Sequence, residues 1–182
     1  MEKRETVVSA GGVKALAHEA RWRAVELLGD MVEATATELS ARIGESASAM
    51  SYHLRVLADA GFVERAPAGK GFDRRERRWR LTFDSFVLNR EPDGDFSLDD
   101  LLQMVDVLAA SLRRRIAATG TIRPRPSMTL SQADLRLTPD EAADFSSRLS
   151  DLIAEYSRLA EDRTGDATVA AYCVVVPLAA DR

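Results

Sequence analysis

The sequence is poor in several residue types. Its single cysteine, Cys173, excludes an internal disulfide and any cysteine-based zinc cluster within one chain. Aromatic residues make up only 6% of the chain, so leucine, valine and alanine must supply most of the core. No apolar run approaches the roughly 18 residues that span a bilayer, and the N-terminus lacks the apolar stretch of a secretory signal. These absences predict a cytoplasmic protein without membrane association.

What is present is an ordinary globular composition, with 46% hydrophobic and 30% charged residues among 182. That length fits one domain, or two small domains that share a core. The net charge is −4, yet residues 62–82 hold seven Lys and Arg against three Asp and Glu. This basic segment predicts a local contact with an anionic partner.

Two short helices are predicted before the basic segment. Thr35 and Glu38 form a capping box that begins the first helix, and Gly44 ends it. Ser46 caps the second helix, which Gly61 ends. The tight turn between them gives helix-turn-helix spacing, although any two short amphipathic helices share this pattern. The residues of the second helix predicted to contact the major groove are Ser46, Ser48, Ser51, Tyr52, His53 and Arg55.

For His53 a second reading stays open, in which the ring caps or packs the junction between helix and strand. The segments 62–65 and 77–82 read as two strands, with prolines and glycines between them that favour a long hairpin loop. Trp79 is expected in the core of this hairpin. A helix-turn-helix followed by such a hairpin is a winged helix. The predicted DNA contacts of the wing are Lys70, Arg74, Arg75 and Arg77.

Residues 15–28 and 46–63 resemble the opening helices and the recognition helix of ArsR-type winged-helix regulators. The combination Ser51-x-His53-Leu54 followed by Leu57-x-x-Ala60-Gly61-Phe62-Val63 carries this resemblance, which covers about residues 10–82. It implies a homodimeric transcriptional regulator, usually a repressor that a signal releases. Metal-sensing members have Cys-x-Cys where this chain has Thr35-Ala36-Thr37, and no histidine follows His53. We therefore expect no metal and no cofactor.

The second half of the chain is less specific. A near-heptad apolar stripe predicts a long helix from residue 98, which pairs with a second copy, packs on its own chain, or does both. The residues predicted to form the dimer interface are Leu98, Leu101, Leu102, Val105, Leu108 and Leu112. A helix over 138–163, between strands at 130–137 and 169–176, predicts a small extension.

The predicted fold is therefore α+β: an N-terminal winged helix-turn-helix, a long dimerisation helix and a small C-terminal strand-helix-strand extension. We place a DNA-binding domain at 1–88 and a dimerisation and effector region at 89–182. No nucleophile, phosphate-loop or dinucleotide motif occurs, so we expect no enzyme. The expected partners are double-stranded DNA and a second copy of the chain. An unknown small-molecule effector stays open as a third partner.

The alternative function is a module that binds a protein or a small molecule through the winged-helix fold, without specific DNA readout. Cys173 lies in an apolar strand-like context that predicts an inert thiol, and the competing reading is a redox sensor. The sequence specifies neither the operator nor the sign of regulation.

Overall fold

The structure is a computed structural model, and it describes residues 5–8, 10–67, 77–83, 85–87, 97–118 and 133–159. The chain divides into two compact units, Met1–Gly120 and Thr121–Arg182. This division falls after the long helix, whereas the sequence placed a boundary at residue 88. The physical reason is that the long helix packs against the first two helices, so it shares their core.

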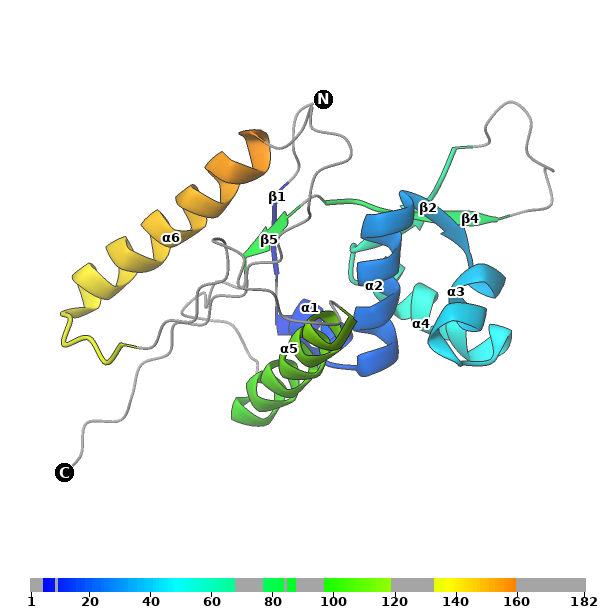
Figure 1. The fold of residues 1–182 in the computed structure, drawn as a ribbon, viewed down its shortest axis with the longest axis horizontal. Coiled ribbons are helices and arrows are strands. Elements are labelled where there is room, and N and C mark those ends of the chain that lie inside the picture. Colours follow the sequence, from blue (N-terminus) through cyan, green and yellow to red (C-terminus); the bar gives the residue numbers. More distant parts are fainter. Residues whose placement is uncertain are drawn as a thin grey trace. The chain divides into compact units, whose positions relative to one another are not determined.

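The first unit contains five helices and five strands within its described residues (Figure 1). The helices are α1 (Ala10–Leu16), α2 (Glu19–Met31), α3 (Ala36–Ile43), α4 (Ala47–Asp59) and α5 (Leu98–Ala118). The strands are β1 (Glu5–Val7), β2 (Glu33–Thr35), β3 (Val63–Arg65), β4 (Arg78–Leu81) and β5 (Ser85–Val87). In the second unit the structure describes one helix, α6 (Pro139–Leu159). The fold is α+β, with an N-terminal winged helix-turn-helix followed by the long helix α5.

A small antiparallel sheet forms the base of the wing. Its strand order is β2-β4-β3, so the strand before the helix-turn-helix and both hairpin strands lie in one sheet. Trp79 pairs with Ala34 on one side and with Arg65 on the other. Its side chain is 5% exposed, which confirms the expected place of Trp79 in the core. The helix-turn-helix and its wing are thereby joined through one shared strand.

Helices α3 and α4 begin and end at the capping residues and glycines that the sequence predicted. Thr35 and Glu38 form the reciprocal capping box at the start of α3. Gly44 follows α3 in the left-handed conformation, with φ of 88°, and Gly61 follows α4 with φ of 82°. Ser46 caps α4 through its hydroxyl oxygen, which accepts a hydrogen bond from the Ala49 N–H at 3.1 Å. Glycine adopts positive φ without the steric cost that a Cβ imposes, so the two glycines terminate these helices.

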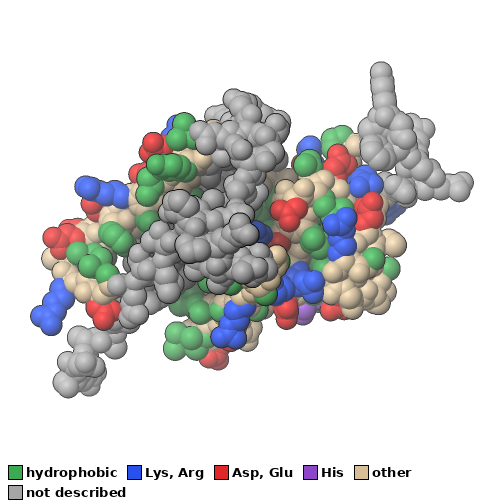
Figure 2. Space-filling model, in the orientation of Figure 1, with side chains coloured by type: hydrophobic (Ala, Val, Ile, Leu, Met, Phe, Trp, Pro, Cys, Tyr) green, Lys and Arg blue, Asp and Glu red, His purple; other side chains and the backbone are tan. Residues whose placement is uncertain are grey.

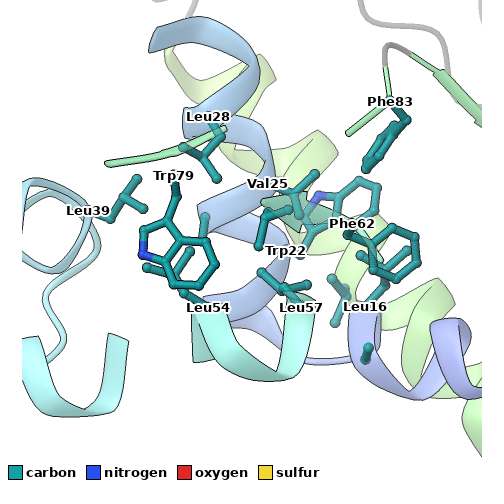
Figure 3. Packing of buried hydrophobic residues seen from close by; sticks show 14 of the residues in the cluster. Leu16, Trp22, Val25, Leu28, Leu39, Leu54, Leu57, Phe62, Trp79 and Phe83 are labelled. Atoms are coloured by element: carbon teal, nitrogen blue, oxygen red, sulfur yellow. The ribbon is translucent and has the colours of Figure 1, made fainter. Parts of the chain in front are cut away.

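The core of the first unit is built from every helix in it (Figure 3). Leu16 of α1, Leu28 of α2, and Leu54 and Leu57 of α4 are almost completely buried. Met104 of α5 is also buried in this cluster, at 1% exposure. Helix α4 is consequently held by packing against α1, α2 and α3, and α5 belongs to the same core.

Two features differ from the sequence prediction. β1 and β5 form a parallel pair that the sequence did not indicate, because its partners lie about 80 residues apart and only the fold brings them together. The strand predicted over 130–137 is wrong in its described part, since residues 133–137 are irregular and exposed. The apolar side chains Leu135 and Leu137 find no sheet partner there among the described residues. The second predicted strand, 169–176, lies outside the described residues.

Candidate nucleic-acid interface

Helix α4 has one buried face and one exposed face. Met50, Leu54 and Leu57 are completely buried and hold the helix on the core. On the opposite side Ser48, Tyr52 and Arg55 are exposed, with Tyr52 at 56%. Their spacing of four and then three residues places them on one side of the helix. The exposed side therefore offers a hydroxyl, a phenol and a guanidinium in a row.

The hydroxyls at the start of α4 already have roles in the helix. Ser46 is the N-cap, and the half-buried Ser51 donates its hydroxyl proton to the Ala47 carbonyl at 2.8 Å. The Nε atom of Arg55 in turn donates to the Ser51 carbonyl at 3.2 Å, which directs the guanidinium along the helix. Ser51 can thus only accept a further hydrogen bond, whereas Ser48 is exposed in the first turn of the helix.

His53 lies on the packed side of α4 and not on its exposed side. The residue is 8% exposed, and its ring centroid lies 4.7 Å from that of His18. Burial lowers the pKa of His53, and the neighbouring His18 and Arg21 lower it further by charge repulsion. The pKa of His18 is lowered for the same reasons, with burial first and Arg21 second. This geometry supports the packing interpretation of His53.

Of the predicted wing contacts, Lys70, Arg74 and Arg75 lie outside the described residues. Arg77 is described, and it is exposed at the start of β4. The two arginines that follow it in the strand are held by carboxylates of this chain. Arg80 binds Glu64 through two hydrogen bonds of 2.9 and 2.7 Å, and Arg78 lies 3.2 Å from Glu38.

The contact between Arg78 and Glu38 joins the wing to the helix-turn-helix, and the sequence analysis missed it. Glu38 accepts a hydrogen bond from the Thr35 N–H at 2.7 Å, which is the main reason that its pKa is lowered. The Glu38 carboxylate also forms an ion pair with Arg78. The Nε atom of Arg78 lies 3.7 Å from Oε2 of Glu33. One carboxylate therefore caps α3 and anchors β4. The capping box was visible in the sequence, but the arginine 40 residues away carried no local signal.

Helix α5 also has two faces. Met104, Val107 and Ser111 are buried against the rest of the first unit, and Leu108 packs on the same core. A second row of side chains is exposed, and it includes four of the six residues predicted to form the dimer interface. The apolar members of the exposed row are Leu98 (70%), Leu102 (52%), Val105 (36%), Leu112 (38%) and Ile116 (42%). Of the other two predicted interface residues, Leu108 belongs to the chain's own packing and Leu101 is half-buried.

Acidic and basic side chains are intermingled over the described surface of the first unit (Figure 2). Among the described residues, no group of three His, Cys, Asp or Glu side chains is arranged to hold a metal ion. No helix in the described ranges is both long enough and apolar enough to cross a membrane.

In α6, apolar side chains such as Phe145, Leu152 and Tyr156 are exposed.

Comparison with known proteins identifies the segment that contains these features. Residues 16–66 match the family model described as "Helix-turn-helix domain". The match spans α2, β2, α3, α4 and β3, and it covers less than a third of the chain. Residues 16–66 thus form a helix-turn-helix domain, the unit with which many transcriptional regulators bind DNA. No curated protein was found to match the chain.

Two solved structures are similar over most of the chain. A MarR family transcriptional regulator from Silicibacter pomeroyi DSS shares 14% identity at a TM-score of 0.35, over 79% of this chain and 72% of the other. RV1404 from Mycobacterium tuberculosis shares 15% identity at a TM-score of 0.33, over 84% and 83%. At these TM-scores neither likeness bears on function.

Proposed function

We propose that this chain is a homodimeric transcriptional repressor of the ArsR type that binds an inverted repeat in DNA. The single observation that carries the proposal is the division of α4 into a fully buried apolar face and an exposed face. That exposed face bears Ser48, Tyr52 and Arg55 within a helix-turn-helix domain. Such a helix enters the major groove with its outer side chains toward the bases.

Each exposed residue of α4 fits a different task. Arg55 suits a bidentate contact to guanine, and Tyr52 offers both a hydroxyl and an apolar ring to the groove. Ser48 lies in the first turn of α4, where free N–H groups and the helix dipole favour a phosphate. Ser46 and Ser51 support this face by capping and by binding the helix backbone.

The wing supplies contacts that do not depend on sequence. We assign Lys70, Arg74, Arg75 and Arg77 to phosphates or to the minor groove. Replacing Arg74 and Arg75 by alanine should weaken binding to all sequences and reduce the salt slope of the affinity by about 1 to 2 units. Titrations of labelled duplex at several salt concentrations measure this slope. An unchanged slope would remove the wing from the mechanism.

The exposed row of α5 has the pattern of an antiparallel helix pair formed with a second copy. Together with the exposed Ala109, its members follow one another at separations of four, three, four, three and four residues, which is a heptad seam. Antiparallel pairing about the middle of the helix matches every member with another. The pairs between the two copies are Leu98 with Ile116, Leu102 with Leu112, and Val105 with Ala109.

Charge also favours this arrangement over a parallel one. Asp99 flanks the seam near the start of α5 and Arg113 flanks it near the end, and both side chains are exposed. In the antiparallel pair, Asp99 of each copy lies beside Arg113 of the other, and the two helix dipoles oppose one another. A parallel pair would instead place the two N-terminal ends of α5 side by side, and likewise the two C-terminal ends, so that like charges meet.

A charge exchange tests this interface. Asp99→Arg alone and Arg113→Asp alone each place like charges together at two symmetric positions, and each should raise the dimer dissociation constant about tenfold. The double variant restores opposite charges and should recover the dimer. Sedimentation velocity measures the dissociation constants. Equal dimer strength in all four proteins would contradict the antiparallel register.

Selection of bound duplexes from a random library, at roughly physiological salt, tests DNA readout. The expected result is an inverted repeat with half-sites about 34–36 Å apart, which matches two recognition helices in successive grooves. A reporter gene behind the selected site should be silenced by the protein. Binding without enrichment, or no binding, would support the alternative of a module that contacts proteins or small molecules.

A further inference from the structure

A half-buried carboxylate joins α5 to the recognition unit, which comprises α2, α3 and α4. Glu26 lies on α2 with a side chain only 15% exposed, and three residues of α5 surround it. Ser111 donates its hydroxyl to Glu26 Oε1, Arg115 Nε lies 3.2 Å from the same oxygen, and Arg114 Nη2 lies 3.2 Å from Oε2. Both carboxylate oxygens are therefore occupied by donors from one helix.

The electrostatics show that Glu26 is held as an anion. Burial by itself would raise the pKa of Glu26, but hydrogen bonds from Ser111 and Arg115 and the charge of Arg115 outweigh it and lower the pKa. A buried carboxylate loses much of its hydration, so it stays charged only where donors of this kind replace the water. These contacts add a polar link between α2 and α5 to the apolar packing of Met104 and Val107.

The surface is hollowed beside Glu26. A cavity of 240 Å³ lies beside Glu26, between α2 and the end of α5, and Leu27, Asp30 and Ala118 also line it. Beside this hollow the two helices are linked by polar contacts, while Met104 and Val107 hold α5 on the core elsewhere along the helix. The polar contacts are the hydrogen bonds and ion pairs of Glu26.

The same helix is also bound to the helix-turn-helix. Arg23, one turn before Glu26, donates to the Ile43 carbonyl at 2.9 Å and to the Arg42 carbonyl at 3.3 Å. These carbonyls end α3, directly before the Gly44 turn that leads to α4. Helix α2 also packs against α4, and Figure 1 shows it between α5 and the α3–α4 pair. A polar path therefore runs from α5 through α2 to the turn of the helix-turn-helix.

We propose that Glu26 is a positioning residue that fixes the angle between α5 and the recognition unit, and thereby the half-site spacing that the dimer accepts. The inference rests on the proposed function, because it needs DNA binding by a dimer joined through α5. Glu26 itself does not touch the DNA. Its role is to transmit the geometry of the dimer to α4.

A small change in angle is enough to matter. A helix of 13 residues, such as α2 or α4, is about 20 Å long. A tilt of about 10° at one end displaces the other by about 3.5 Å, which is close to the rise of one base pair. Loosening the Glu26 contact should therefore let the dimer bind sites whose half-sites are one base pair closer or farther apart.

The test compares the affinity of full-length variants for a set of duplexes. These carry the selected half-sites at the preferred spacing and at spacings changed by one and two base pairs. Glu26→Gln keeps the shape of the side chain and removes its charge. The matched control is Glu19→Gln, which removes an exposed partner of the same Arg114, 3.0 Å away and 62% exposed. Arg115→Gln breaks the contact from the α5 side, in case Glu26→Gln fails to fold.

We expect the preference for the selected spacing over a one-base-pair change to fall about tenfold in Glu26→Gln and in Arg115→Gln, and to persist in Glu19→Gln. Dimer mass and affinity for a single half-site should not change. A spacing preference that is the same in all four proteins would overturn the inference and leave the proposed function intact. A wild-type protein that is monomeric, or that shows no spacing preference, would overturn both.

Discussion

Substitutions on the two faces of α4 should have different effects. A change on the buried face should lower stability, and a change on the exposed face should weaken DNA binding. Leu54 is completely buried, so Leu54→Ala leaves a cavity in the core and should cost about 2–5 kcal/mol of unfolding free energy. For a unit the length of Met1–Gly120, an unfolding entropy of about 2.1 cal/mol/K per residue gives about 0.25 kcal/mol/K. The melting temperature should then fall by about 8–20 °C, as measured by circular dichroism or calorimetry.

The matched change on the exposed face is Tyr52→Ala. Because Tyr52 is 56% exposed, its removal should alter stability by no more than about 0.5 kcal/mol, or about 2 °C. The same change should weaken binding to the selected site about tenfold or more, and Leu54→Ala should bind normally well below its melting temperature. If Tyr52→Ala melts as early as Leu54→Ala, or binds DNA like the wild type, the assignment of the two faces is wrong.

Two further predictions follow from local features. The pKa values of His18 and His53 are lowered in the fold, mainly by burial, so the unfolded chain binds more protons below about pH 6.5. Stability should therefore fall as pH decreases from 6.5 through the folded pKa values, and urea midpoints at pH 7.5 and 5 should show a smaller loss in His53→Gln. Val32 ends α2 with φ of 66° and is 71% exposed, a conformation that strains a β-branched residue. Val32→Gly should raise the melting temperature by about 4 °C, and a decrease would show that no strain is stored there.

Much of the DNA-binding unit could be predicted because its signals are local. The capping box of Thr35 and Glu38, the cap at Ser46 and the positive-φ glycines act within a few residues of one another, so the sequence alone defines where α3 and α4 begin and end. The apolar spacing of Met50, Leu54 and Leu57 likewise determined which side of α4 faces the core. The winged helix-turn-helix follows from these signals.

Contacts between distant residues were decided only by the tertiary structure. His53 has the spacing of a groove contact, yet it is 8% exposed and its ring lies beside that of His18. Periodicity alone could not show which residues of the apolar stripe on α5 are buried. Packing against α1 and α2 decides that Leu108 turns inward while Leu102 stays exposed.

The contact of Glu26 with Ser111, Arg114 and Arg115 spans about 85 positions of the chain. Nothing in the residues around Glu26 distinguishes it from the other acidic side chains of α2. Where α3 and α4 begin and end follows from the sequence alone, since capping residues and glycines act on their neighbours. Which charged side chains meet was decided by how the helices pack, because ion pairs form between surfaces that only the fold brings together.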